Sequence, residues 1–248
     1  MKRLLVFFLV LTLFCPAALA DPLPLLEDYS EDIAEPYDET DPSAGTFVYS
    51  YRYPHVDETA EGGSGINVFY LDLIDYDLGF TVPFLQDSFE GYDSSTVITY
   101  EITCNNDDFF SVLVRKEENN PDTSRVYWTG NVFARKNGGS GTTTNLPRYL
   151  GILETASNDT WLEDRQTAKA DKLVRKMVWD VISDNSAGIP YHSDFTEEEL
   201  SHVFFPEEDF YLDETGNPVF FLQPGVAAPE DAGLLVFPIP LEDILDEL

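Results

Sequence analysis

The chain has 248 residues, of which 43% are hydrophobic, and it carries 46 acidic against 14 basic side chains. Its formal net charge of −32 argues against a nucleic-acid-binding protein and against contact with anionic membranes, because both surfaces repel it. The length is enough for one large domain or two small ones, and the apolar content is enough for a real core.

The first twenty residues have the plan of a secretory signal peptide. A short basic start precedes an apolar run over residues 4–14, and Ala18 and Ala20 are the small residues that a signal peptidase reads. The run is too short for a comfortable membrane span, although an uncleaved signal anchor remains the alternative. We therefore expect an exported protein whose mature chain begins at Asp21 and makes no membrane contact.

The acidity has three interpretations. A highly charged surface keeps an exported protein soluble and monomeric. It also attracts a cationic partner and speeds association at low salt. Clustered carboxylates can instead bind divalent cations, but the sequence has no D-x-D-x-D-G loop of the calcium type. An exported protein has no access to ATP or nicotinamide cofactors, so we expect no cofactor, and we also expect no metal. The sequence does not predict the oligomeric state.

Residues 21–45 differ in composition from the rest of the chain. They contain nine acidic residues, four prolines and no basic residue, and they show no sustained apolar period. This composition is typical of a flexible acidic linker. We expect it to precede an α+β domain over residues 46–248, or two sub-domains that divide near residue 145, as 46–145 and 146–248.

Apolar periodicity and turn residues predict the elements of that domain. The middle three strands are joined by short turns rich in Asn, Asp and Gly, which indicate an antiparallel meander. The predicted fold class is α+β: an antiparallel sheet, made of the meander plus a C-terminal hairpin, with helices packed on one face. The expected strands are 46–53, 97–103, 109–115, 125–135, 210–213, 219–223 and 233–238, and the expected helices are 66–74, 161–184, a short one after Thr196, and 241–248.

Few residues in the sequence are candidates for catalysis. There are two H-x-D pairs, His55 with Asp57 and His192 with Asp194. A metal hydrolase can use His and Asp at this spacing, but neither pair has a second patterned ligand, so we favour turn or surface roles for both pairs. Cys104 is the one cysteine left after signal cleavage, and strand alternation places it on an apolar face. We therefore expect a buried, unreactive thiol and no disulfide.

Several segments resemble a known family: Tyr51-Arg52-Tyr53-Pro54, Ile66-Asn67, Tyr100-Glu101-Ile102, Phe110-Ser111-Val112 and, most specifically, residues 210–240. The region 46–248 resembles the C-terminal domain of unknown function shared by RsiV-type anti-sigma factors, the bacterial lysozyme receptors, and by some peptidoglycan deacetylases. The resemblance implies an α+β fold, an extracytoplasmic bacterial setting and, through the receptors, a cationic protein partner. Signalling and deacetylation are not carried over, because we find neither a sigma-binding segment with a membrane span nor a deacetylase domain.

Our leading hypothesis is therefore a secreted, non-enzymatic binding protein of the bacterial cell envelope. Its ligand would be a cationic protein such as lysozyme, or a cell-wall glycan. One alternative is a cell-wall hydrolase or deacetylase that uses His55 or His192 with acidic neighbours. The other is a purely structural envelope protein. No binding residue is transferred from the resemblance, because no position-specific motif maps onto the chain.

Overall fold

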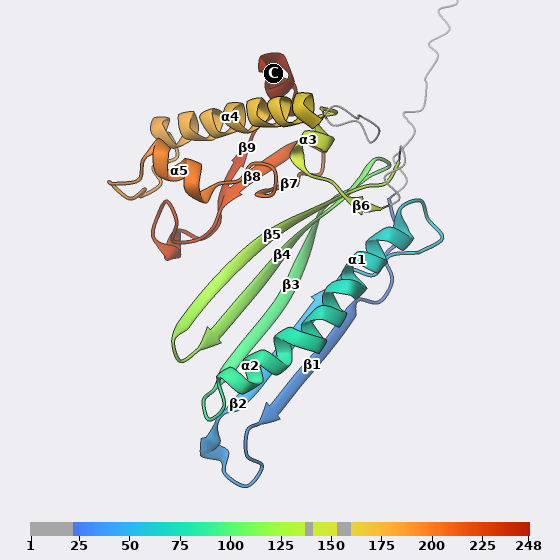
Figure 1. Cartoon of the computed structure of the whole chain (residues 1–248), viewed down its shortest axis with the longest axis vertical. Helices are drawn as coiled ribbons and strands as arrows, with labels where there is room; N and C mark the ends of the chain where they lie inside the picture. Colours follow the sequence, from blue (N-terminus) through green and yellow to red (C-terminus); the bar gives the residue numbers. More distant parts are fainter. Residues whose placement is uncertain (1–21, 137–140, 153–159) are drawn as a thin grey trace, which may run out of the picture.

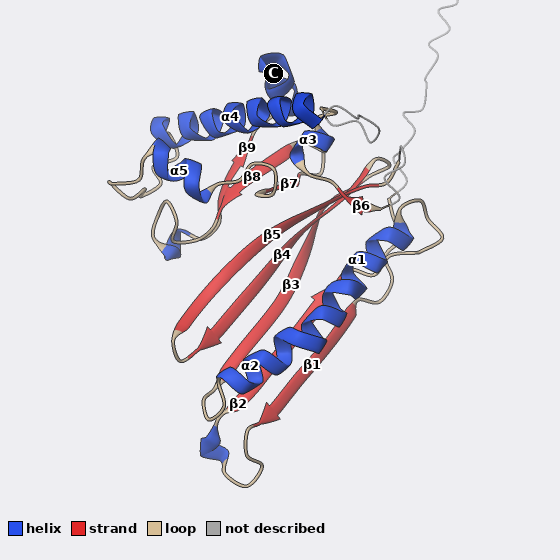
Figure 2. Cartoon of the chain, viewed as in Figure 1, coloured by secondary structure: helices blue, strands red, loops and turns tan. Residues whose placement is uncertain are grey.

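The structure is a computed structural model that describes residues 22–136, 141–152 and 160–248 (Figure 1). The expected signal peptide, residues 1–20, lies outside the described residues. A long curled sheet with one helical layer forms one part of the molecule, and a smaller sheet covered by helices forms the other (Figure 2). This arrangement confirms the α+β class.

The large sheet has six strands in the order β1-β2-β3-β4-β5-β6. The strands are β1 (Tyr29–Pro36), β2 (Thr46–Tyr53), β3 (Ser94–Asn105), β4 (Phe109–Asn120), β5 (Thr123–Ala134) and β6 (Thr142–Thr143). The predicted meander is confirmed in β3, β4 and β5, which pair antiparallel. However, β2 pairs parallel to β3, so the sheet is mixed and not purely antiparallel. A parallel pair needs a crossover, and here the helical layer provides it.

That helical layer is longer than the sequence predicts. Helix α1 (Gly63–Tyr76) contains the expected helix, and a π-helical turn, Asp77–Thr81, joins it to α2 (Val82–Ser88). We expected Gly79 and Pro83 to interrupt the chain here. Instead the wider turn accommodates Gly79, and Pro83 lies in the first turn of α2, where its missing amide costs no hydrogen bond.

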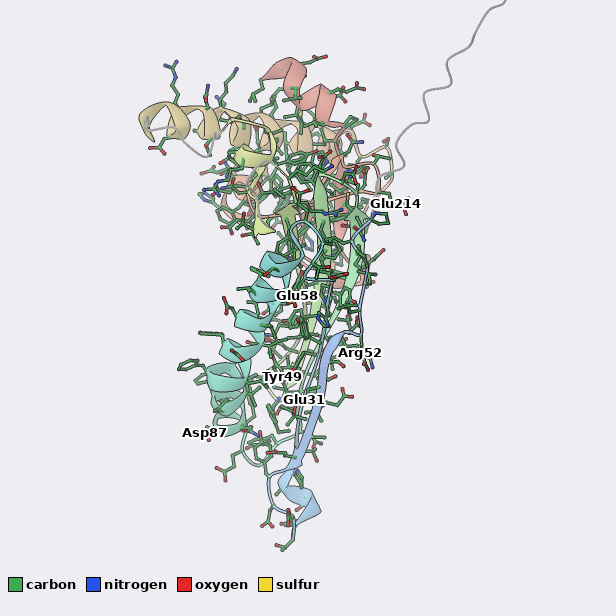
Figure 3. The ribbon with its side chains drawn as sticks, turned by 90° about the vertical axis from the view of Figure 1, so that its right-hand side faces the viewer. Glu31, Tyr49, Arg52, Glu58, Asp87 and Glu214 are labelled. Carbon is green, nitrogen blue, oxygen red and sulfur yellow. The ribbon has the colours of Figure 1, made fainter. Side chains whose placement is uncertain are left out.

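The π turn is fixed to the sheet by one carboxylate. Asp77 accepts a hydrogen bond from the Tyr49 hydroxyl at 2.6 Å and another from the Thr81 hydroxyl at 2.8 Å. In Figure 3 the ring of Tyr49 lies between the helical layer and the strands. Burial and Asp77 together raise the pKa of Tyr49, so this hydroxyl stays protonated and keeps donating.

Residues 22–45, the described part of the segment 21–45, do not form the flexible linker that we expected. β1 pairs with β2 along its whole length, Leu25 bridges to Val56, and Leu23 is only 2% exposed. β1 is an edge strand, so it needs little apolar surface. Its acidic side chains face solvent or accept hydrogen bonds from hydroxyl groups on β2. The acidic composition therefore predicted a linker where the chain forms a strand with few buried positions.

The second sheet is the predicted C-terminal hairpin extended by one strand. β7 (Phe210–Leu212), β8 (Pro218–Leu222) and β9 (Leu235–Pro238) pair antiparallel, and they form a separate sheet instead of extending the meander. The helices of this part are α3 (Leu146–Tyr149), α4 (Thr160–Asp184), α5 (Glu197–Val203) and α6 (Leu241–Glu247), which confirms the three that we predicted. Short 3-10 turns occur at Pro42–Ala44 and Glu230–Ala232.

Buried residues form two clusters. One fills the space between the large sheet and α1, and it includes Tyr49, Tyr70 and Phe133. The other lies between α4, the small sheet and the opposite face of the large sheet, and it includes Val174 and Phe220. The helices thus cover two sheets from separate sides. The expectation of one sheet with helices on one face is corrected, because the C-terminal hairpin packs across the meander and does not continue it.

Besides the shared hydrophobic cluster, three close contacts between described residues of the two parts are informative. The Ser111 hydroxyl, fully buried on β4, accepts the amide of Leu212 at 3.0 Å. The Gln223 side chain pairs with the backbone of Trp128. Gly130 passes so close to β7 that a Cβ there would lie 1.9 Å from the carbonyl oxygen of Phe210. The junction therefore combines this hydrophobic cluster with a residue that has no side chain and with two polar side chains.

Among the helices in the described ranges, none has the length and apolar character needed to cross a membrane.

Candidate functional site

The first H-x-D pair lies just after β2. The His55 ring stacks on Tyr29 at a centroid distance of 4.3 Å, and its Nδ1 lies 3.0 Å from the carbonyl oxygen of Glu27. Asp57 accepts hydrogen bonds from the amide and hydroxyl of Thr59, which lower the pKa of its carboxyl group. Both side chains thus have local partners that fix β1 and the loop before α1.

The second pair lies in the loop between α4 and α5. His192 and Asp194 are exposed, and the backbone amide of His192 donates to the carbonyl of Ala227 at 2.9 Å. The two pairs belong to different parts of the fold. Within residues 22–136, 141–152 and 160–248, no three His, Cys, Asp or Glu side chains form a group that could hold a metal ion. The catalytic role of His55 or His192 stays a prediction.

Cys104 is buried at 2% exposure on β3, as strand alternation predicted. Burial, with a smaller contribution from the charge of Asp213, raises the pKa of its thiol to about 11. A thiol with this pKa holds very little thiolate at neutral pH, so Cys104 is a packing residue.

The clearest functional feature is the charge of the N-terminal part. We call residues 22–105, which form β1, β2, β3 and the helical layer, the acidic arm. They carry 18 acidic side chains and one basic side chain, Arg52, for a net charge of −17. In Figure 3 Asp87 lies on the helical side of the arm, and Arg52 lies on the other side of the sheet. The helical side therefore presents carboxylates without an arginine or lysine from the arm itself.

Large aromatic side chains lie exposed on that same helical side. Tyr76 is 61% exposed, and Phe80 and Phe84 are each 68% exposed. The rings of Tyr76 and Phe80 contact each other at 5.4 Å between centroids. Val68 and Leu71, also exposed, extend the row along α1. We call these five residues the aromatic stripe.

The π turn explains why the stripe is continuous. Residues four apart lie on one face of a helix, and the wide turn around Gly79 carries that face from α1 into α2. Asp72, Asp75 and Asp87 are exposed on the same helices. The stripe therefore combines apolar contact area with negative charge. The sequence shows the signal as aromatic residues at 76, 80 and 84, but the expected helix break at Gly79 hid it.

A second group of acidic side chains is buried at the other end of the molecule. Burial raises the pKa of Asp209 to about 6, although the amide of Phe205, which donates to its carboxylate at 2.7 Å, acts in the opposite direction. Burial and the nearby Glu207 also raise the pKa of Asp171 on α4. Asp171 lies on α4 and Asp209 lies just before β7, so both belong to the part of the chain outside the acidic arm, and they influence stability more directly than binding.

Comparison with solved structures supports the fold. The chain is similar to a DUF3298 family member from Bacteroides fragilis, with a TM-score of 0.50, 9% identity and coverage of 90% of this chain and 93% of that one. It is also similar to a DUF3298 family protein from Pseudomonas aeruginosa, with a TM-score of 0.53, 12% identity and coverage of 92% and 94%. No family model matches the sequence, and no curated protein matches it. The neighbours confirm the fold of a domain of unknown function over nearly the whole chain.

Proposed function

We propose that this chain is a secreted, non-enzymatic binding protein of the bacterial envelope and that its ligand is a cationic protein. The observation that carries the proposal is the aromatic stripe between exposed carboxylates on α1 and α2. Aromatic side chains provide much of the energy of protein interfaces, whereas surrounding charges determine partner choice and association rate.

The stripe fits a protein partner better than a nucleotide or a small anion. Exposed side chains this large, placed on a convex helix surface, offer contact area without enclosing a small ligand. The acidic arm has a net charge of −17, so only a partner with positive charge gains from approaching it. A purely structural role would not require aromatic side chains to remain in water.

The proposal agrees with the resemblance to the extracytoplasmic domain of the RsiV-type lysozyme receptors. Lysozyme is a strongly cationic protein of the kind that the acidic arm would attract. Export is part of the same proposal and rests on the signal-peptide pattern of the first twenty residues. A glycan ligand and a hydrolase that uses His55 or His192 stay as alternatives that the experiment below separates.

Hen lysozyme is a suitable probe. Binding to the chain from Asp21 onward would be measured by calorimetry at about 20 mM and about 150 mM NaCl, which correspond to weak and to physiological screening. We expect saturable binding at both, with weaker affinity at the higher salt. Replacing Phe80 and Phe84 by Ser should weaken binding about tenfold or more, since exposed aromatic anchors account for much of such interfaces.

The matched control for the aromatic pair is Leu245→Ser with Val236→Ser, because both side chains are also exposed but lie on α6 and β9. This control should leave lysozyme affinity unchanged. Binding that disappears at physiological salt would mean that the acidic residues provide only general charge attraction, and it would contradict the proposal. Hydrolysis of peptidoglycan fragments that is lost in His55→Ala or His192→Ala would support the enzyme instead.

A further inference from the structure

A cleft of about 760 Å³ lies between β5 and the segment that follows β8. One side of it is the first half of β5, including Val126 and Trp128. The other side is formed by residues 223–226, 230–231 and 233–234. The cleft is remote from the aromatic stripe, and the proposed function does not use it.

Gln223 shows how the β5 edge is oriented. Its side-chain oxygen accepts the backbone amide of Trp128 at 2.9 Å, and its side-chain nitrogen donates to the backbone carbonyl of Trp128 at 2.7 Å. Both backbone groups of Trp128 therefore point away from β4. In an antiparallel pair this orientation alternates, so every second residue of β5 has its backbone groups directed outward.

The alternation identifies the open positions. Val132, four residues further on, accepts the amide of Thr144 at 2.7 Å, as an outward-facing residue should. Toward the other end of β5, the same parity directs the backbone of Val126 and Ser124 outward, at the cleft. No backbone hydrogen bond joins the outward groups of these two residues to another described residue. They form a short stretch of unpaired sheet edge.

The Gln223 carboxamide has the same donor and acceptor as a peptide group. It occupies on β5 the place that one residue of an additional strand would take, and the edge continues beyond it over Val126 and Ser124. We propose that this cleft binds an extended peptide segment of another protein, which adds to β5 as a further strand and continues the pairing that Gln223 begins. Strand addition of this kind obtains affinity from main-chain hydrogen bonds and selectivity from alternate side chains.

The surroundings define the side chains of that peptide. Ser124, Val126 and Trp128 share one face of β5, and the guanidinium carbon of Arg115 lies 6.0 Å from the centre of the Trp128 ring. An apolar side chain of the peptide packs on this face. Glu230 and Asp231 are exposed on the opposite wall of the cleft. Arg125 also lines the cleft and interacts with Glu230, so Asp231 is the carboxylate that favours a basic residue at the neighbouring position. The occupant is an extended segment in which apolar and basic residues alternate.

The probe is an acetylated and amidated peptide, Lys-Val-Thr-Val-Lys. It would be titrated into isotopically labelled protein while amide chemical shifts are recorded. We expect a Kd below about 1 mM, with the largest shifts at the amides of Ser124, Val126 and Trp128. Two N-methylated peptides test the main-chain pairing: one is methylated at both Val residues, the other at Thr and the second Lys. Because only alternate amides face β5, one of the two should bind about tenfold more weakly than the other.

A pair of variants tests the same point from the protein. Val126→Pro removes an amide that β4 does not use, whereas Val126→Thr keeps it in a strand-favouring residue. We expect the Pro variant to lose peptide binding about tenfold or more and the Thr variant to keep it. Both variants should still bind lysozyme as the unchanged chain does, so this proposal and the proposed function can fail separately.

Three results would overturn the inference. These are equal binding by the two N-methylated peptides, shifts that map to α1 and α2 instead of β5, and no saturable binding up to several mM peptide. Self-association of the protein through this edge, seen as concentration-dependent shifts of Val126 without peptide, would also overturn it, since it would assign the edge to a second copy of the chain. If Val126→Pro does not fold, the N-methylated peptides decide alone.

Discussion

The acidic arm and the remainder of the molecule have nearly the same net charge, but they differ in how many basic side chains accompany the acidic ones. Residues 22–105 carry 18 acidic and one basic side chain, whereas residues 106–248 carry 27 acidic and 11 basic. Close contacts of opposite charge among the described residues of the second region include Arg115–Glu117, Lys116–Glu118, Lys136 with Asp107 and Asp108, and Lys176–Asp180. The acidic arm concentrates negative charge without local compensation.

This difference argues against solubility as the whole explanation of the acidity. A charge that serves only solubility has no reason to gather around exposed aromatic side chains, because such side chains promote association. The acidic arm holds both features on α1 and α2, and the second region places its aromatic residues mostly inside a core. The combination of exposed aromatic side chains and uncompensated charge is therefore found on the acidic arm, where the proposed function places the cationic partner. The following predictions are ordered by the size of the expected effect.

The largest expected effect is at the junction between the large sheet and the small sheet, within residues 106–248. Gly130→Ala places a Cβ 1.9 Å from the carbonyl oxygen of Phe210, so either β5 or β7 must move. We expect the free energy of unfolding, measured in urea, to fall by about 3 kcal/mol or more. Hydrogen exchange should show the loss at residues 210–222 before the strands of the acidic arm are affected.

Gly79→Ala is the control for that substitution. Nothing lies within 4 Å of a Cβ at Gly79, and Ala favours helix by about 1 kcal/mol over Gly. The variant should be as stable as the unchanged chain or slightly more so. If Gly130→Ala were equally harmless, the large and small sheets would not be held together by the close approach of β5 and β7.

A smaller loss of folding stability is expected from Gln223→Ala. The substitution removes the two hydrogen bonds between the side chain and Trp128, each worth about 1 kcal/mol. We expect the free energy of unfolding to fall by about 1–2 kcal/mol. Gln223→Glu keeps the acceptor for the Trp128 amide but loses the donor to the Trp128 carbonyl. Its free energy of unfolding should therefore lie between those of the unchanged chain and of Gln223→Ala. An unchanged stability in Gln223→Ala would show that this contact does not hold the small sheet to β5.

The buried carboxyl of Asp209 predicts a pH dependence in the second region. Its pKa is raised from 3.8 to about 6, so between these values the folded protein holds a proton that the unfolded chain has lost. Stability therefore falls as pH rises through this window, and the deficit persists above it. Asp209→Asn should raise the free energy of unfolding by about 1 kcal/mol near pH 7.5, with little effect near pH 3.5. A stabilisation that is equal at both pH values would contradict the burial of an ionised group.

The smallest effect concerns salt. Screening weakens the repulsion among carboxylates, so the melting temperature should rise by a few degrees between about 20 mM and about 500 mM NaCl. The triple variant Asp72→Asn, Asp75→Asn and Asp87→Asn should show a smaller rise. A melting temperature that falls with added salt would mean that attractive ion pairs dominate over repulsion.

Periodicity identified most of the elements, and its failures have physical reasons. The run from Phe47 to Tyr53 and the hairpin around Gly216 could be predicted because each has a full local pattern. β1 was missed because an edge strand buries few side chains. The parallel pairing of β2 with β3 depends on where the crossover returns, and no local pattern encodes that.

The candidate site was harder to predict than the fold. The H-x-D pairs were candidates for catalysis because the sequence has few histidines. In the structure His55 stacks on Tyr29, and His192 is an exposed loop residue. The aromatic stripe has a regular spacing, but it crosses Gly79 and Pro83, which ordinarily end a helix. The edge at Val126 depends on Gln223, almost a hundred residues away in the sequence, so only the folded chain reveals it.

The central claim is that the carboxylates beside the aromatic stripe select a cationic partner. The most direct test compares hen lysozyme binding by two triple variants at about 150 mM NaCl. One variant neutralises Asp72, Asp75 and Asp87 as Asn, and the other neutralises the exposed Glu198, Glu214 and Asp246 of the second region as Gln, Gln and Asn. Both have the same net charge. The account predicts that the first loses about tenfold or more in affinity while the second stays within about twofold of the unchanged chain. Equal losses in both variants would contradict it.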